Sequence, residues 1–345
     1  MIKAEALSRK YGDVVAVSDV SFEIGAGEIV GLLGHNGAGK TTIMKMLTGY
    51  LEPSAGAVTI EGVDVWSNRS FTQRRVGYLP ENCPLYPDMA VLDYLDYLAV
   101  LRGVPESQRA ERLLYVIEKA ALTSVAKSEI GTLSRGYRQR LGVAQALLNS
   151  PRIVILDEPT NGLDPSQILE MRELIRELAR TATIVLSTHI LQEVQAVCSR
   201  VIIINNGKVA LDQALSDLQS MRRVRIVTDA QPASVNELLA ALGDLSVDEC
   251  RHRDKLYEYI VEAPADESAP SVNRLLVENG WRVYAIHPVV RDLETIFGEI
   301  TAGARAQDVS VKSDRAAAGQ EDLMVPQGIA QKVGSSVGEG GAANE

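Results

Sequence analysis

The stretch Gly34–Thr42, with the sequence GHNGAGKTT, constrains the fold of this chain more than any other segment. It follows a short apolar run, 28–33, and precedes a segment of helical character, 42–48. Glycines let backbone N–H groups approach an anion closely, and the N-terminus of the following helix adds positive potential at the same place. The spacing G-x-x-x-x-G-K-[ST] between a strand and a helix therefore predicts a loop that binds the phosphates of a nucleoside triphosphate.

Two side chains of this phosphate loop have specific predicted roles. Lys40 supplies a positive charge for the β- and γ-phosphates, and Thr41 offers a hydroxyl group to Mg²⁺. A chance match in an ordinary turn is the alternative, and the strand and helix patterns on either side disfavour it. The other loop residues are predicted to surround the nucleotide: Gly34, His35, Asn36, Gly37, Ala38, Gly39 and Thr42.

Length and charge limit the possible partners. The 345 residues suffice for two domains, at least one with a sizeable core. A formal net charge of −10 argues against non-specific binding to nucleic acid or to an anionic lipid surface. It does not exclude docking onto a protein that is embedded in a membrane.

Cysteine usage and hydropathy point to a reducing compartment. Cys83, Cys198 and Cys250 are odd in number and lack a C-x-x-C spacing, so the sequence indicates neither a disulfide framework nor a zinc site. The N-terminal residues lack the apolar core of a signal peptide, and runs such as Val201–Ile204 are too short to span a bilayer. We therefore expect any membrane part to be supplied by another chain.

The periodicity of residues 1–220 predicts an α/β domain. Short β-type pieces such as Val14–Val20 and Ala57–Ile60 come first, and helical patterns cover Val91–Arg102 and Glu106–Ala121. Strand and helix patterns then alternate, which predicts a parallel sheet with buried apolar strands. These later segments are Arg152–Asp157, Gln167–Ala179, Thr183–Ser187 and Arg200–Ile204. Within the first helical pattern, the leucine stripe at 92, 95, 98 and 101 is predicted to face the core.

From about residue 222 the pattern changes to a smaller module, for which we predict residues 221–301. Its order of strands and helices is βαββαβ, which predicts a ferredoxin-like α+β domain. The segments are Val224–Val227, Val235–Leu242, Val247–Arg251, Leu256–Val261, Ser271–Glu278 and Trp281–Ile286. A final helix, Asp292–Ile300, is predicted to pack beside the module. Residues 302–345 carry few large apolar side chains and are predicted to be disordered.

Three predicted strands end in residues that suit phosphate chemistry, because ligands gather at the carboxyl ends of parallel strands. One ends in the phosphate loop. Another ends in Asp157, which is suited to hold Mg²⁺, and Glu158, which is suited to accept a proton from an attacking water or to orient it. A third ends beside His189, which is placed to reach the γ-phosphate. A solvated strand end and a core histidine are the alternatives for each residue taken alone.

Together these motifs resemble those of the ATP-binding subunit of an ATP-binding-cassette (ABC) transporter. The phosphate loop matches the Walker A motif, 153–160 matches Walker B with its glutamate, and Asn161–Asp164 resembles the D-loop. The segment Leu133–Arg140, LSRGYRQR, resembles the signature motif that this family alone carries. The resemblance covers roughly residues 2–220. It implies a P-loop NTPase cassette with a parallel core sheet, an antiparallel β subdomain and a helical subdomain.

The resemblance adds roles for residues outside the strand ends. It implies that Tyr11 stacks on adenine and that His189 is the switch histidine. Ser134 and Gly136 are implied to face the γ-phosphate across a dimer, and Asp164 is implied to contact the nucleotide site. Ser134 is also predicted from the residues alone to cap the N-terminus of the following helix.

Two departures from the common family pattern stand out. The signature has Arg135 and Tyr137 where the common form has glycine and glutamine, while Ser134 is retained. Glu81 stands where most members carry glutamine. It is implied to lie near Mg²⁺ and the nucleotide, or instead to line the groove that a permease occupies. These forms, with an appended C-terminal module, are most similar to bacterial exporter-type subunits.

The resemblance implies an ATPase that uses ATP and Mg²⁺ and dimerises with a second cassette, identical or pseudo-symmetric, around two ATP molecules. It would drive a separate integral-membrane permease from the cytoplasmic face of the inner (plasma) membrane, with contact near 81–102 and with no nucleic-acid partner. One alternative is a soluble ABC ATPase that is not coupled to transport. This chain lacks the second cassette or the long coiled coil usual in such proteins. Another is a nucleotide-gated binding module without turnover, which the presence of Glu158 disfavours.

Overall fold

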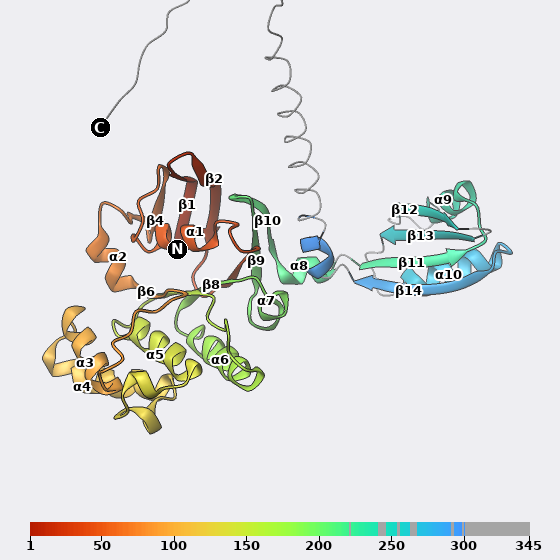
Figure 1. Cartoon of the computed structure of the whole chain (residues 1–345). Coiled ribbons are helices and arrows are strands. Elements are labelled where there is room, and N and C mark those ends of the chain that lie inside the picture. The colour runs from red at the N-terminus through yellow and green to blue at the C-terminus, as the bar shows by residue number, and fades with distance from the viewer. Residues whose placement is uncertain are drawn as a thin grey trace, which may run out of the picture. The chain divides into compact units, whose positions relative to one another are not determined.

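The computed structural model describes residues 1–220, 222–240, 246–253, 256–262, 268–290, 293–298 and 300. Two sheets and a group of helices make up residues 1–220, and a third sheet with its own helices follows in the chain (Figure 1). The tail predicted to be disordered, 302–345, lies outside the described residues, as do the last two residues of the helix predicted at 235–242.

A six-stranded sheet in the order β10-β9-β3-β8-β7-β6 forms the centre of the first part. Its inner strands pair in parallel, and only β10 joins in the antiparallel sense, at one edge. The predicted parallel sheet is therefore confirmed. The strands are β3 (Ile29–Leu33), β6 (Val76–Leu79), β7 (Ile153–Asp157), β8 (Thr183–Thr188), β9 (Arg200–Asn205) and β10 (Lys208–Ala214).

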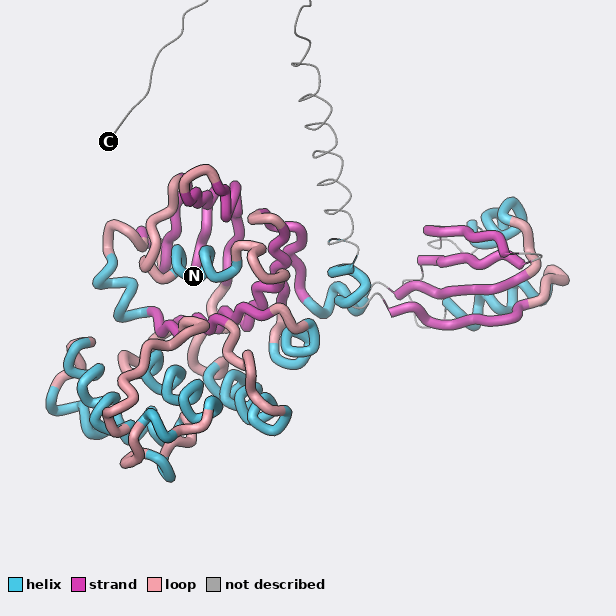
Figure 2. Tube along the Cα trace, viewed as in Figure 1, coloured by secondary structure: helices cyan, strands magenta, loops and turns pink. Residues whose placement is uncertain are grey.

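A separate antiparallel sheet covers one side of the domain, and helix α1 (Lys40–Leu47) is packed between the two sheets (Figures 1 and 2). Ile43 and Leu47 of α1 share one apolar cluster with Leu7 of the antiparallel sheet and Ile155 of the central sheet. This packing fixes the phosphate loop, because the loop leads directly into α1. The antiparallel strands, in the order β2-β1-β4-β5, are β1 (Ile2–Tyr11), β2 (Val14–Ile24), β4 (Ala55–Ile60) and β5 (Val63–Asp64).

Helices cover the opposite face of the central sheet (Figure 2). Side chains alternate along a strand, so Ile153 and Ile155 join the α1 side while Val154 and Leu156 join the helical side. Both faces of β7 are buried, which explains its continuous apolar run. The helices of this part are α2 (Arg69–Arg75), α3 (Val91–Leu101), α4 (Glu106–Lys119), α5 (Arg135–Leu147), α6 (Pro165–Leu178), α7 (Leu191–Val197) and α8 (Leu215–Ser220), with 3₁₀ turns at Thr123–Val125 and Ile130–Thr132.

The predicted core-facing leucine stripe of α3 is only partly correct. Leu95 is fully buried and Leu98 is half-buried, but Leu92 is 37% exposed and Leu101 is 63% exposed. A strict spacing of three residues falls short of a 3.6-residue turn, so the stripe rotates by about 180° over its four members. Its two ends therefore leave the core, and Leu101 lies on the surface.

The C-terminal module has the predicted βαββαβ order. Its sheet runs β12-β13-β11-β14 with every neighbouring pair antiparallel, which is the ferredoxin-like arrangement. Ile226, Val235, Tyr259 and Leu276 belong to a core of its own. The elements are β11 (Arg222–Thr228), α9 (Pro232–Ala240), β12 (Ser246–Arg253), β13 (Leu256–Glu262), α10 (Ser268–Glu278) and β14 (Val283–Val290).

The prediction that the final helix packs beside this module is wrong. Residues 293–298 are helical, but Leu293 and Ile296 are buried in one cluster with Val201 of β9 and Leu218 of α8. The chain thus returns to the first domain after the module, because the apolar side chains of β9, α7 and α8 leave a surface there to be covered. No helix among the described residues is both long and apolar enough to cross a membrane.

Candidate nucleotide site

The phosphate loop lies between β3 and α1, and its shape requires glycine at several positions. Gly37 and Gly39 have φ angles of 82° and 109°, in the left-handed region that favours glycine. A Cβ atom on Gly34 would lie 2.5 Å from the carbonyl oxygen of Ile204, which belongs to the backbone of β9. The loop is therefore pressed against the sheet.

A cavity of about 460 Å³ opens above this loop. Because β3, β8 and β7 are parallel neighbours, the residues at their carboxyl ends meet at this cavity. The sequence predicted most of its lining, which consists of Ala16, Asn36, Gly37, Gly39, Lys40, Thr41, Thr42, Glu81, Glu158, Asn161 and His189. The predicted residues Gly34, His35 and Ala38 lie outside this lining and shape the loop instead.

Lys40, Glu158 and His189 form a chain of contacts across the cavity. The Lys40 ammonium group donates to the carbonyl oxygen of Gly34 (2.8 Å) and pairs with Oε1 of Glu158 (3.3 Å). The other carboxylate oxygen of Glu158 lies 2.9 Å from Nδ1 of His189. Glu158 itself has a φ angle of 50°, a strained value for a residue with a long side chain. The fold therefore holds a buried lysine–glutamate pair with a more exposed histidine at its open side.

Asp157 is fully buried beside the loop. Its Oδ1 atom accepts hydrogen bonds from Ser187 Oγ (2.5 Å) and from Thr41 Oγ1 (3.3 Å). Burial raises the pKa of Asp157, and these two hydrogen bonds oppose the rise. Its Oδ2 atom is buried and has no hydrogen-bond partner among the described residues. An unpartnered carboxylate oxygen next to a threonine hydroxyl group is a donor set that fits Mg²⁺.

The structure does not bring the signature residues Ser134 and Gly136 to the phosphate loop of their own chain. Ser134 caps α5 by accepting from the backbone N–H of Tyr137 (3.4 Å), as the sequence predicted. Both residues line a separate cavity of about 320 Å³, which shares no residue with the phosphate cavity. A Cβ atom on Gly136 would lie 2.6 Å from the side chain of Gln167 on α6, so the signature turn is packed against that helix.

Two further predicted residues also lie outside the phosphate cavity. Asp164 caps the N-terminus of α6, accepting from the backbone N–H of Gln167 (2.9 Å) and the hydroxyl group of Ser166 (2.6 Å), and these bonds lower its pKa. Tyr11 ends β1 with 46% of its surface exposed, and the Arg9 guanidinium group lies 5.0 Å from its ring centre. The stacking role of Tyr11 and the nucleotide contact of Asp164 remain predictions.

Sequence reasoning missed the supports of the site. Ser187 orients Asp157, and Asn161 and Ala16 line the cavity. Glu193 on α7 is 3% exposed and accepts hydrogen bonds from the hydroxyl groups of Thr160 and Thr188 (2.7 Å for Thr188). The contacts of Ser187 with Asp157 and of Thr160 with Glu193 join residues 30 and 33 positions apart, so no local pattern could indicate them.

Comparison with known proteins decides the family. The family profile described as ABC transporter matches residues 17–161. The uncharacterized ABC transporter ATP-binding protein YdbJ of Bacillus subtilis (strain 168) is 35% identical over 303 residues, covering 87% of this chain and 95% of that protein. The chain belongs to the family of ABC transporter ATP-binding proteins. It is an ATP-binding and ATP-hydrolysing subunit of this family.

Other relatives agree with this family assignment. The bacitracin transport ATP-binding protein BcrA of Bacillus licheniformis is 33% identical, over 88% of this chain and 98% of that protein. A solved structure described as the dimeric structure of MJ0796, a bacterial ABC transporter cassette, is 25% identical with a TM-score of 0.58. That alignment covers 62% of this chain and 99% of that chain.

The departure at Arg135 has a structural explanation in this ABC protein. Gly162 in the D-loop has a φ angle of 72°, and a Cβ atom there would lie 2.4 Å from the Arg135 guanidinium carbon. The arginine of the signature therefore packs directly on the D-loop backbone. This contact ties the start of α5 to the loop that precedes α6.

Proposed function

We propose that this chain binds ATP with Mg²⁺ in the phosphate cavity and uses its hydrolysis to drive a separate membrane permease. The observation that carries the proposal is the convergence of Lys40, Glu158 and His189 around one cavity at the ends of three adjacent parallel strands. Asp157 is buried beside this cavity and is joined to it through Thr41. This set supplies a cation for phosphate, a metal-binding carboxylate, and a carboxylate that can act on water.

We assign Lys40 to the phosphate groups and Glu158 to the attacking water. Phosphate binding draws the Lys40 ammonium group away from Glu158, because phosphate oxygens carry more charge than one carboxylate oxygen. Glu158 is then free to orient the attacking water and to accept its proton. His189 holds the other oxygen of Glu158 (2.9 Å) and reaches toward the γ-phosphate. The buried position of Glu158, 6% exposed, strengthens these interactions by keeping bulk water out.

The metal site is assigned to Asp157 and Thr41. When bound, Mg²⁺ neutralises charge on the β- and γ-phosphates. Thr41 would offer its hydroxyl group to the ion. The unpartnered Oδ2 of Asp157 would hold the ion directly or through one of its water ligands. Glu81 lines the same cavity but is exposed, so a role near the metal and a role toward the permease are both compatible with its position.

The complete ATP site is assigned to two protomers. The phosphate loop of one protomer would be closed by Ser134 and Gly136 of its partner, since these residues occupy a different cavity in their own chain. Similarity to a dimeric ABC cassette supports this arrangement. Asp164, at the start of α6 beside the signature cavity, would then lie near the dimer interface.

Docking to a permease is supported by exposed apolar side chains around α3. In a cassette with a well-packed core, such a surface marks a protein contact. A soluble ABC ATPase that works without a permease has no evident use for it. The relative BcrA is named for bacitracin transport, which supports export, and the chain would then work at the cytoplasmic face of the plasma membrane. The exposed residues are Tyr86, Leu92, Tyr97, Val100 and Leu101.

The substitution Glu158→Gln tests this function. It should keep ATP binding but lower turnover by ~10²–10⁴-fold, because water is no longer activated. ATP with Mg²⁺ should then hold two copies together, and size-exclusion chromatography would show a dimer. Glu173→Gln, an exposed change on α6, is the matched control and should behave as the wild type. A Glu158→Gln chain that stays monomeric and turns over normally would exclude the proposed role.

A further inference from the structure

The D-loop, residues 161–164, joins the two cavities that the proposed ATP site divides between two chains. Asn161 lines the phosphate cavity, and Ser166 and Gln167, which follow the loop on α6, line the signature cavity. The loop also begins only three residues after Glu158. A side chain that holds the D-loop in place is therefore able to act on the proposed catalytic base.

Arg135 of the signature lies flat against the middle of this loop. A Cβ atom built on Gly162 would lie 2.4 Å from the guanidinium carbon of Arg135 and 2.7 Å from both Nε and Nη1. These are the distances of a point directly above the plane of the group, close to its central carbon. Gly162 also has a φ angle of 72°, in the region that favours glycine. The guanidinium group is thus stacked on the D-loop backbone, where only a glycine leaves room for it.

This stacking is the contact through which the Arg135 side chain meets the rest of the chain. Arg135 is exposed, and within the described ranges its guanidinium group has neither a hydrogen bond nor an ion pair. Substitutions at exposed positions without such bonds usually change stability little. Removal of this side chain should therefore affect the D-loop without unfolding the domain.

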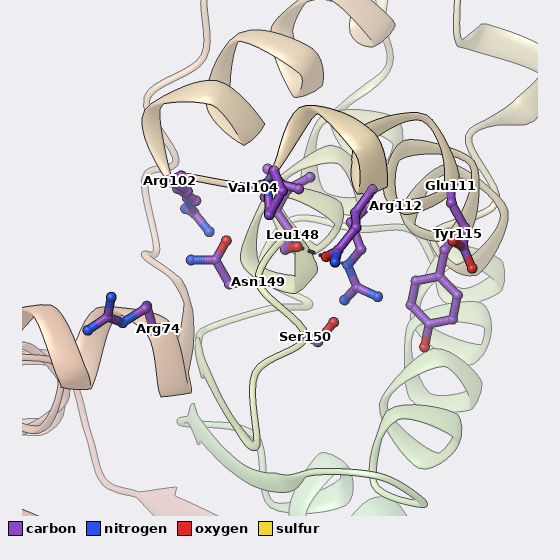
Figure 3. Close-up of a pocket in the computed structure, with 12 residues that line it drawn as sticks. Arg74, Arg102, Val104, Glu111, Arg112, Tyr115, Leu148, Asn149 and Ser150 are labelled. Atoms are coloured by element: carbon purple, nitrogen blue, oxygen red, sulfur yellow. Dashed lines mark hydrogen bonds between the residues drawn. The ribbon is translucent and has the colours of Figure 1, made fainter.

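The helix that carries Arg135 is held firmly at its other end. Arg112 of α4 donates to the carbonyl oxygens of Leu147 and Leu148, at the end of α5 (Figure 3). These bonds give partners to carbonyl groups that a helix leaves unpaired in its last turn. Helix α5 therefore presents Arg135 to the D-loop from a fixed position.

A tight turn leads from the D-loop back to Glu158. The backbone N–H of Asn161 donates to the carbonyl oxygen of Glu158 (3.2 Å), and the N–H of Glu158 donates to Ser187 Oγ (3.1 Å). Glu158 has a strained φ angle of 50°, which its neighbours must maintain. Ser187 holds one side of the turn, and Arg135 holds the other side through Gly162. Without Arg135, the Glu158 carboxylate would be less well placed for the attacking water.

We propose that Arg135 positions Glu158 of its own chain, although the neighbouring Ser134 serves the ATP site of the partner chain. This inference rests on the proposed function, in which each ATP lies between the phosphate loop of one protomer and the signature of the other. Two adjacent residues of the signature then act on the two different ATP sites of the dimer. The common family form has glycine in place of Arg135 and lacks this contact, so the assignment applies to the arginine form.

Steady-state kinetics test the positioning role. Arg135→Ala should lower kcat about 10-fold with little change in the KM for ATP or in the melting temperature, because a small displacement of a reacting group slows the reaction while the phosphate loop stays intact. Arg180→Ala, at an exposed arginine just after α6, is the matched control. Arg135→Lys keeps the charge but not the flat group, so it should be as slow as Arg135→Ala. In a Glu158→Gln background, Arg135→Ala should have no further effect, because its action passes through Glu158.

Mixing variants shows on which ATP site Arg135 acts. In a 1:1 mixture of Arg135→Ala with Lys40→Ala, a residue that acts on its own chain leaves a lesion in each site of the mixed dimer. About a twentieth of wild-type activity should then remain, given a 10-fold slower variant and random pairing. If Arg135 acted together with Ser134 on the partner's site, the mixed dimer would keep one intact site, and about a quarter of the activity would return.

The outcomes separate this inference from the proposed function. Recovery to a quarter would overturn the inference, as would wild-type kcat in Arg135→Ala or Arg135→Lys, or a further loss in the Glu158→Gln background. The mixture of Ser134→Ala with Lys40→Ala is the reference. If it recovers activity, the composite site of the proposed function stands whatever Arg135 does. If it stays inactive, the composite site is wrong and the inference falls with it.

Discussion

At the scale of single residues, the buried carboxylate of Asp157 lowers the stability of the folded chain. Its pKa is raised by burial, so the folded state disfavours the charged form relative to the unfolded chain. The ionised carboxylate therefore costs stability above the raised pKa, and this cost disappears as pH falls below the unfolded pKa, about 4. A function that needs a metal-binding carboxylate accounts for a residue that the fold alone would not favour.

The prediction is that Asp157→Asn stabilises the chain without nucleotide at neutral pH but removes Mg²⁺-dependent turnover. The expected gain is on the order of 1 kcal/mol, the value of one pKa unit, because the neutral amide avoids the desolvation cost of the buried carboxylate. Thermal unfolding near neutral pH and near pH 4 should show the gain shrinking in acid. Asp164→Asn is the control of opposite sign, because hydrogen bonds lower the pKa of Asp164, and it should lose stability at neutral pH. A melting temperature for Asp157→Asn at or below the wild type would contradict this account.

The residues that the sequence could predict are those whose position follows from one local pattern. Lys40 belongs to the phosphate loop, and Glu158 and His189 follow buried strands, so a parallel sheet brings all three together. Ser187 could not be predicted as the partner of Asp157, since that hydrogen bond joins residues 30 positions apart. Nor could the sequence show that Lys40 pairs with Glu158, because ion pairing depends on side-chain geometry across two strands.

At the scale of elements, helix α7 fixes the ends of β7 and β8 through one buried carboxylate. Glu193 accepts from Thr160, which follows β7, and from Thr188, at the end of β8. These threonines lie two positions from Glu158 and one from His189. The spacing of Glu158 and His189, the proposed catalytic side chains, is therefore supported by a contact that lies outside the cavity.

The prediction is that Glu193→Ala lowers the free energy of unfolding by ~2–4 kcal/mol, because two buried hydroxyl groups lose a charged acceptor. Turnover should fall as well, with ATP affinity less affected. Glu193→Gln keeps the shape and one acceptor, so it should recover most of the stability. Denaturant unfolding and steady-state kinetics provide the readouts. Wild-type kcat in a Glu193→Ala chain that still folds would show that Glu193 does not position the site.

The sequence predicted the helices and strands better than it predicted how they pack. The strand–helix alternation predicted the central sheet and the module, since period and turn residues are local. The prediction that the leucine stripe of α3 faces the core was only partly correct, because residues spaced by three drift around a helix. The prediction for the final helix was wrong, because the sequence does not show which surface its apolar face covers. Leu293 and Ile296 lie with Val201 and Leu218, and only the folded surface of β9 and α8 could decide this.

At the scale of the whole molecule, the two halves of the proposed ATP site lie in separate cavities. The phosphate loop with Lys40 and Glu158 forms one cavity, and Ser134 with Gly136 forms the other. If the proposed site is correct, a single chain can bind phosphate but lacks the second wall of its site. Dimerisation would therefore be part of catalysis, and the closing of two protomers over ATP would be the movement that a permease uses.

The last prediction tests this division by mixing variants. Ser134→Ala alone should cost ~0.5–2 kcal/mol of stability as a lost helix cap and should also remove activity, and Lys40→Ala should be inactive. In a mixed dimer one interface carries both lesions and the other carries neither. A 1:1 mixture should then recover about a quarter of wild-type activity, since half of the dimers are mixed and each has one intact site.

The matched control mixes Lys40→Ala with Glu158→Gln. These two residues lie 3.3 Å apart in one chain, so every site of that mixed dimer keeps one lesion and no activity should return. Recovery in the first mixture and none in the second would place Ser134 on the opposite protomer from Lys40. Equal behaviour of the two mixtures would mean that Ser134 acts within its own chain, as a helix cap alone, and that the second cavity has no part in the reaction.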